Sequence, residues 1–138
     1  MDAHPYIVHF PIALIILSFF YQCLTVFMPS RLPAQLTLWA LVPGVLATIP
    51  AVLTGEKAEG SLTDIPEEVH GLIETHELFA NITTWGGMIL LCVWLYLVMK
   101  KVDNKQVQLL LLAFLGLLFA SVCVTGYIGG QLVHVHDI

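Results

Sequence analysis

Six histidines are the residues of this chain whose type and spacing best suit chemistry. They stand at the edges of apolar stretches in groups of two: His4 and His9, His70 and His76, His134 and His136. Imidazole ligates haem iron and transition metals, carries protons and changes its charge near neutral pH. If the fold gathers these groups, the sequence predicts a cofactor or metal site where they meet.

Four apolar segments are the elements that must position the histidines. They cover about residues 6–28, 36–53, 76–99 and 106–128. Each meets or approaches the roughly 20 residues that a helix needs to cross a bilayer. Backbone groups inside lipid must be hydrogen-bonded within their own segment, so these spans are predicted to be helices. We predict an all-α fold, an integral membrane four-helix bundle that forms a single domain over residues 1–138.

The positive charges predict how the bundle is oriented. Arg31 lies in the first loop and Lys100, Lys101 and Lys105 lie in the third, while Lys57 lies elsewhere. Short loops rich in Lys and Arg stay in the cytoplasm. Both termini and the second loop are therefore expected on the outer, periplasmic side of a bacterial inner (cytoplasmic) membrane. Because the number of crossings is even, all the histidines are expected at that same outer edge.

The composition excludes several classes of function. The chain is 58% hydrophobic and 11% charged, whereas soluble domains carry about 25% charged residues. With a net charge of −5 and no basic patch, nucleic-acid binding is not expected. The sequence has no nucleophile elbow, P-loop or dinucleotide motif, and no CxxCH for covalent haem. We therefore expect no enzyme acting on its own, and the lipid bilayer as a partner.

The third segment has a predicted helix start well before its apolar part. Thr63-Asp64-Ile65-Pro66-Glu67-Glu68 combines a capping residue, an early proline and acidic residues, which is typical of a helix N-terminus. A helix from there to the end of the segment would exceed a bilayer crossing. Either its first turns stand in the outer aqueous layer, or Gly71 or Thr75 breaks it. The first two segments and the last two segments would each form a helical hairpin, and the sequences of the two hairpins do not repeat.

His9 and His76 are the predicted axial ligands of a b-type haem. Each lies just within the outer interface, where an ionisable residue indicates a functional site. Imidazoles are established axial ligands of haem iron, and nearby glycines and aromatic side chains suit a flat cofactor. Haem propionates favour basic partners, and the outer side offers only Lys57. Neutral donors such as Tyr127 and Gln131 would therefore have to serve.

The other histidines are expected to be more exposed, and several roles are open to them. One role is a second haem site, with ligands drawn from His4, His70, His134 and His136. Alternatively, a non-haem site for Zn or Cu takes its ligands from His9, His76, His134 and His136. The H-x-H pair at the C-terminus binds such metals when carboxylates lie nearby. The remaining alternatives are pH sensing and simple hydrogen bonds to backbone carbonyls or interfacial acids.

The start of the chain carries a family resemblance. His4-Pro5-x-x-Val8-His9-Phe10-Pro11-Ile12-Ala13-Leu14 resembles the signature of an uncharacterised family of small bacterial four-helix membrane proteins, classed as a domain of unknown function. The segment end around Gly55, the His76 region and Tyr127–Val133 are also similar to that family's pattern. Members of this family type are sometimes joined to, or encoded near, c-type cytochrome domains. The resemblance therefore implies periplasmic electron transfer.

These observations lead to one hypothesis and two alternatives. The hypothesis is a membrane b-type cytochrome with haem near the outer face. It would pass electrons between the quinone pool, or a membrane partner, and a periplasmic c-type cytochrome. The first alternative is a non-haem membrane protein that binds Zn or Cu. The second is a structural subunit of a larger respiratory assembly.

Overall fold

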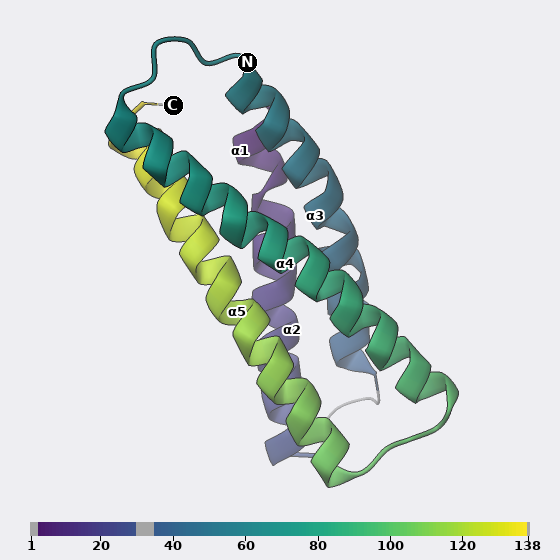
Figure 1. The fold of residues 1–138 in the computed structure, drawn as a ribbon. Helices are drawn as coiled ribbons and strands as arrows, with labels where there is room; N and C mark the ends of the chain where they lie inside the picture. The colour runs from purple at the N-terminus through teal and green to yellow at the C-terminus, as the bar shows by residue number, and fades with distance from the viewer. Residues whose placement is uncertain (1–2, 30–34, 138) are drawn as a thin grey trace.

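The computed structural model describes residues 3–29 and 35–137 of the chain. Within these residues every regular element is an α-helix: α1 (His4–Ile7), α2 (His9–Phe27), α3 (Leu36–Gly60), α4 (Glu67–Met99) and α5 (Lys105–His134). Figure 1 shows α1 and α2 in line with each other, so that together they form one of the 4 long helical rods of the bundle. The prediction of an all-α four-helix bundle is confirmed at this level.

The surface of the bundle suits contact with lipid. The 4 rods are long and apolar enough to cross a membrane. Large apolar side chains are exposed along them, including those of Phe20, Trp39, Ile89 and Leu117. A soluble protein rarely exposes large contiguous apolar patches, whereas lipid tails accommodate them. Structure and composition therefore agree on a multi-pass membrane protein in contact with the bilayer.

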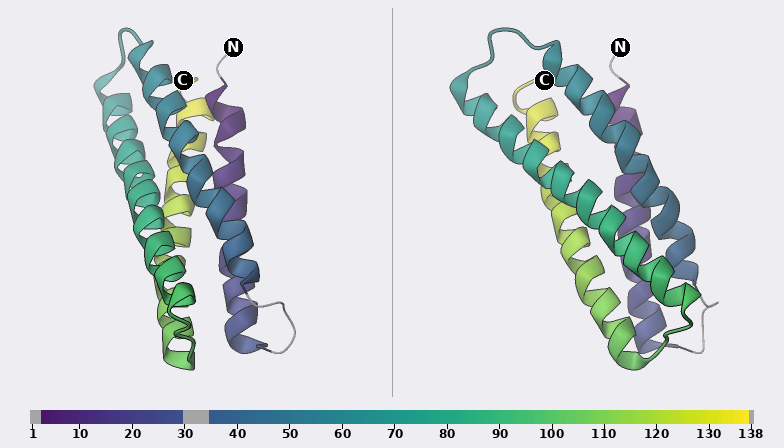
Figure 2. Two further views of the ribbon diagram at one scale, coloured as in Figure 1. Left: turned by 90° about the vertical axis from the view of Figure 1, so that its right-hand side faces the viewer. Right: turned by 45° about the vertical axis from the view of Figure 1, so that its right-hand side comes forward.

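The two ends of the bundle are distinguished by the segments that lie there. Both termini and the loop 61–66 lie at one end, the terminal end (Figures 1 and 2). The end of α2, the start of α3 and the loop between α4 and α5 lie at the other, the hairpin end. Lys100, Lys101 and Lys105 stand at or beside that last loop, whereas Arg31 lies outside the described residues. Which end faces the cytoplasm stays a prediction.

The helices extend beyond the predicted apolar spans at the terminal end. α3 continues to Gly60 and α4 already begins at Glu67, after Pro66 and with acidic residues in its first turn. α4 runs without interruption for 33 residues, about 50 Å at 1.5 Å per residue, and the hydrocarbon core is only about 30 Å thick. Hydropathy marks where lipid ends and not where a helix ends, because polar helix-forming residues continue both helices past the apolar span.

A break between α1 and α2 separates two of the histidines. The helical pattern is interrupted at Val8, and His9 opens α2. Pro11 has no backbone N–H for the carbonyl one turn earlier, which weakens the helix at this point. The imidazole of His9 donates from Nδ1 to the backbone carbonyl of Pro5 across the break. On the two sides of this break, His4 is half-buried and His9 is exposed.

Apolar packing joins all four rods in the hairpin half of the bundle but not at the terminal end. One buried cluster contains residues from α2, α3, α4 and α5, centred on Ile15, Leu41 and Leu115. A second cluster is built by Val69, Ile73, Ile128 and Leu132, from α4 and α5 alone. Among the described residues, neither cluster includes α1 or the last turns of α3. Apolar packing at the terminal end therefore belongs to the second hairpin, formed by α4 and α5, and not to the first hairpin, formed by α1, α2 and α3.

A closed network of polar side chains holds the hairpin end together. Gln22 is 1% exposed and donates from its amide to Oε1 of Gln108 at 2.8 Å. The hydroxyl of Thr37 donates to Oε1 of Gln22 at 3.1 Å, and Gln108 donates to Asp103 at 3.0 Å. Asn104 caps α5 by accepting from the backbone N–H of Val107. Since each of these side chains is used within the network, its role is structural.

Candidate functional site

The structure separates the six histidines by burial. His4, His76 and His136 are half-buried, whereas the imidazoles of the other three are exposed: His9, His70 and His134. His4 comes from the first hairpin and His76 from the second, and their charges are close enough to interact. These two histidines, one from each hairpin, form the pair that the structure brings together.

His4 is held against α3 by a hydrogen bond and a close approach. Its Nδ1 lies 3.0 Å from Oγ1 of Thr54. The single hydroxyl hydrogen of Thr54 is directed to backbone carbonyls, at 2.8 Å from that of Pro50 and 3.0 Å from that of Ala51. Which of the two groups donates in the contact between His4 and Thr54 depends on the tautomer of the imidazole. A Cβ placed on Gly55 would lie 3.0 Å from Cε1 of His4, so glycine is what lets the ring approach the helix.

His76 is held against α5 in the same way. Its Nδ1 lies 3.1 Å from the backbone carbonyl oxygen of Thr125. A carbonyl can only accept, so Nδ1 of His76 is the donor. A Cβ placed on Gly129 would lie 3.1 Å from Cε1 of the same ring. Glycine again allows the imidazole to rest on the backbone of the neighbouring helix.

The two histidine contacts form a matched set that sequence comparison of the hairpins misses. Each contact joins the first rod of a hairpin to its second rod, over 50 residues in the first hairpin and 49 in the second. Each pairs Nδ1 with an oxygen of a threonine and rests the ring on a glycine. The residues around the two contacts do not repeat. The one feature that recurs in the sequence is the separation of histidine and threonine along the chain, 50 residues in the first hairpin and 49 in the second.

The hydrogen bond of His76 fixes the chemistry of its ring. A neutral imidazole with its proton on Nδ1 carries its lone pair on Nε2. Histidines that bind metals usually donate their other ring N–H to a carbonyl, carboxylate or water, which orients the ring and increases its basicity as a ligand. His76, whose Nδ1 donates to the carbonyl of Thr125, has this arrangement.

Carboxylates from α3 and α4 come close to one another at the terminal end. Glu59, Glu56 and Glu74 are near enough to Glu77 to disfavour a negative charge on it. Among the described residues, however, no group of three or more His, Cys, Asp or Glu side chains is arranged to hold a metal ion.

The structure places the other predicted ligands apart from this pair. His9 is exposed next to Tyr6 and Phe10, and its ring is bonded to its own rod through the Pro5 carbonyl. The predicted pairing of His9 with His76 stays a prediction, and the two histidines differ in exposure. His70 and His134 are exposed on α4 and at the end of α5.

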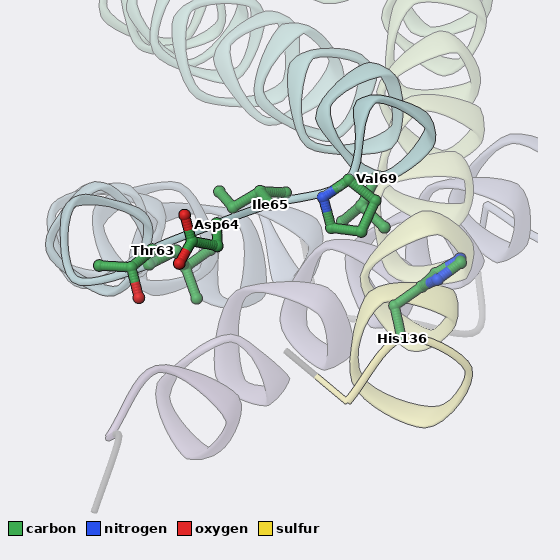
Figure 3. Close-up of a pocket in the computed structure, with 7 residues that line it drawn as sticks. Thr63, Asp64, Ile65, Val69 and His136 are labelled. Atoms are coloured by element: carbon green, nitrogen blue, oxygen red, sulfur yellow. The ribbon is translucent and has the colours of Figure 1, made fainter.

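His136 lines a small surface pocket of about 250 Å³ beside the α3–α4 loop. Figure 3 shows its ring approaching from the C-terminal segment, while Thr63 and Asp64 belong to the loop. A larger apolar groove of about 510 Å³ lies between α4 and α5, lined by residues such as Ile89 and Phe114. Neither His4 nor His76 lines either of these two pockets.

Comparison with known proteins establishes the family of the chain. No curated protein and no solved structure matches it. A family model described as a predicted membrane protein (DUF2231) matches residues 1–138. The predicted resemblance to an uncharacterised family of membrane proteins is thereby confirmed. Because this family model covers the whole sequence, the chain belongs to the DUF2231 family of predicted membrane proteins.

Proposed function

We propose that this protein is a membrane b-type cytochrome whose haem is held between the two hairpins by His4 and His76. The observation that carries the proposal is the matched pair of contacts, in which Nδ1 of each ring lies within hydrogen-bonding distance of an oxygen on the neighbouring rod. The rings come from opposite hairpins and are near enough to influence each other electrostatically. This pair takes the place of the sequence-predicted pair of His9 and His76.

The donor set suits haem in number and chemistry. Imidazole is an established axial ligand of haem iron, and hydrogen bonds to the far side of the imidazole tune the iron. Haem held there by His4 and His76 would supply one-electron transfer. The terminal end also carries Lys57, which follows Thr54 by three residues and so lies on the same side of α3. Lys57 is the cation that this end offers to a propionate.

The proposed orientation of the protein in the membrane follows from the charges at the two ends of the bundle. Lys100, Lys101 and Lys105 at the hairpin end favour a cytoplasmic location for that end. The terminal end and its histidine pair would then face the periplasm of a bacterial inner membrane. There the haem would exchange electrons with the quinone pool or a membrane partner, and with a periplasmic c-type cytochrome.

Haem content per chain in detergent-purified variants tests the ligand assignment. His4→Ala and His76→Ala are each expected to abolish six-coordinate haem. His70→Ala is the matched control, because it removes an exposed histidine from the same helix as His76, and it should bind haem like wild type. Full haem content in both His4→Ala and His76→Ala would overturn the proposal. Loss in His9→Ala but not in His4→Ala would restore the pairing predicted from sequence.

A further inference from the structure

An apolar groove of about 510 Å³ runs along the surface of the second hairpin, between α4 and α5. Buried leucines such as Leu90 and Leu118 form its floor, and exposed side chains such as Ile89 and Phe114 form its rims. The groove follows from the course of the two helices, which spread apart toward the hairpin end (Figure 1). Because its rims are exposed and apolar, the groove meets hydrocarbon when the bundle stands in a membrane.

The length of the groove suits an acyl chain. Along α4 its lining extends from Ile82 to Leu97, about 22 Å at 1.5 Å per residue. One leaflet contributes about 15 Å, half of the hydrocarbon core, so a chain from a single leaflet fits within the groove. Gly86 belongs to this lining, and a Cβ there would meet only Cδ1 of Leu118, at 4.0 Å. Glycine at this position therefore leaves space for an occupant.

The two ends of the groove differ in what they offer to a polar headgroup. Toward the terminal end of the bundle, the hydroxyls of Ser121 and Thr83 lie 2.7 Å apart, and both bond to the backbone carbonyl of Phe79. These two hydroxyls are therefore engaged with each other and with the backbone. Toward the hairpin end, the lining finishes at Leu97 and Val107, beside the loop between α4 and α5.

Positive charge stands at the hairpin end of the groove. Lys100 and Lys101 follow α4 and Lys105 begins α5, and all three are exposed. Asp103 is the acidic residue of the same loop, and its carboxylate accepts a hydrogen bond from α5. The amine of Lys100 lies 5.9 Å from the centre of the Tyr96 ring, and tyrosines exposed on membrane helices favour the depth of the headgroups. The loop therefore sets three cations against one acid where lipid phosphates lie.

We propose that this groove binds an anionic phospholipid, with one acyl chain between α4 and α5 and the phosphate among Lys100, Lys101 and Lys105. The apolar lining accommodates the chain, and the lysines attract the negative headgroup. Each lysine near an anionic membrane surface contributes about fivefold to binding. A zwitterionic phospholipid with the same chains has no net charge, so we expect the anionic lipid to bind about tenfold more tightly or better. This site is independent of haem.

Native mass spectrometry of the detergent-purified protein tests the headgroup, with phosphatidylglycerol and phosphatidylcholine of identical dioleoyl chains added in turn. Wild type is expected to retain phosphatidylglycerol about tenfold better. The triple variant Lys100→Gln, Lys101→Gln, Lys105→Gln should lose this preference. The same three positions changed to Arg keep the charge and should keep the preference. Equal retention of the two lipids by wild type would overturn the proposal.

Gly86→Leu tests the acyl chain in the same measurement. The leucine side chain would occupy the groove, so retention of both lipids should fall. Gly71→Leu is the matched control, because Gly71 lies on the same helix outside the lining and a Cβ there would meet nothing within 4 Å. Unchanged lipid retention in Gly86→Leu would overturn the proposal. A wild-type dimer that is lost in Gly86→Leu would also overturn it, because the groove would then hold a second copy of the chain.

Discussion

The two ends of the bundle place polar side chains among apolar helices in different ways. At the hairpin end, Gln22, Thr37 and Gln108 bond to one another, and a described partner accounts for each. At the terminal end, Nδ1 of His4 and Nδ1 of His76 each contact an oxygen of the neighbouring helix. Buried polar groups must be paired at both ends. The hairpin end does this with amides and hydroxyls, and the terminal end does it with imidazoles.

Apolar packing shows the same division. The larger buried cluster takes residues from all four rods, whereas the smaller one at the terminal end is confined to the second hairpin and the adjoining loop. At that end the two hairpins bring His4 near His76, and α3 and α4 bring Glu59 near Glu77. The hairpin half is therefore expected to determine stability, and the terminal end to determine ligand binding. Substitutions at each end test this separation.

The largest effect is expected from Gly129→Ala at the terminal end. The added Cβ would lie 3.1 Å from Cε1 of His76, closer than ordinary van der Waals contact, so the ring must shift and its hydrogen bond to Thr125 should weaken. Haem content should fall sharply, and overpacking should destabilise the fold by about 1–3 kcal/mol. Haem content per chain and unfolding in mixed micelles measure the two effects.

Gly130→Ala is the control for that variant. It lies on the same helix, and a Cβ there would meet nothing within 4 Å, so both properties should stay at the wild-type level. Equal haem content in the two alanine variants would show that the close contact with Gly129 does not position the ring of His76.

Gln22→Ala at the hairpin end is expected to have a smaller effect, which lowers stability and leaves haem content unchanged. The change leaves the hydroxyl of Thr37 and the side-chain oxygen of Gln108 without their described partner. The bundle should lose about 1–2 kcal/mol of stability, while the haem content of the folded fraction stays unchanged. Gln106→Ala, at an exposed glutamine of the same end, should alter neither. If Gln22→Ala lowered haem content with no loss of stability, the hairpin end would not be the end that determines stability alone.

The smallest effect is expected at the cap of α5. Asn104 accepts from the backbone N–H of Val107 at 3.0 Å, and removing such a cap costs about 1 kcal/mol. Asn104→Ala should lower stability by that amount in the same unfolding measurement. Asn81→Ala replaces an exposed asparagine inside α4, where alanine favours the helix, so this control should be as stable as wild type or slightly more stable.

The sequence was sufficient to predict the four rods and the start of α4, because hydropathy and the Pro66–Glu68 pattern are local properties. It did not predict that α3 continues to Gly60, because the polar turn that extends it carries no apolar signal. The pairing of His4 with His76 depends on the break at Val8 and on the rotation of each helix, which no local pattern fixes. Thr54 was missed because a threonine in an apolar helix becomes informative only when the histidine that it faces is known.

The most direct test of the histidine pair is the visible absorption spectrum of wild-type protein purified in detergent from cells with ample haem. The spectrum is recorded in the oxidised state and again after reduction with dithionite. Haem held by His4 and His76 predicts a Soret band that shifts sharply on reduction and resolved α and β bands, as six-coordinate bis-histidine iron gives. A featureless visible spectrum in both states would contradict haem binding and assign the pair to another metal or to a structural role.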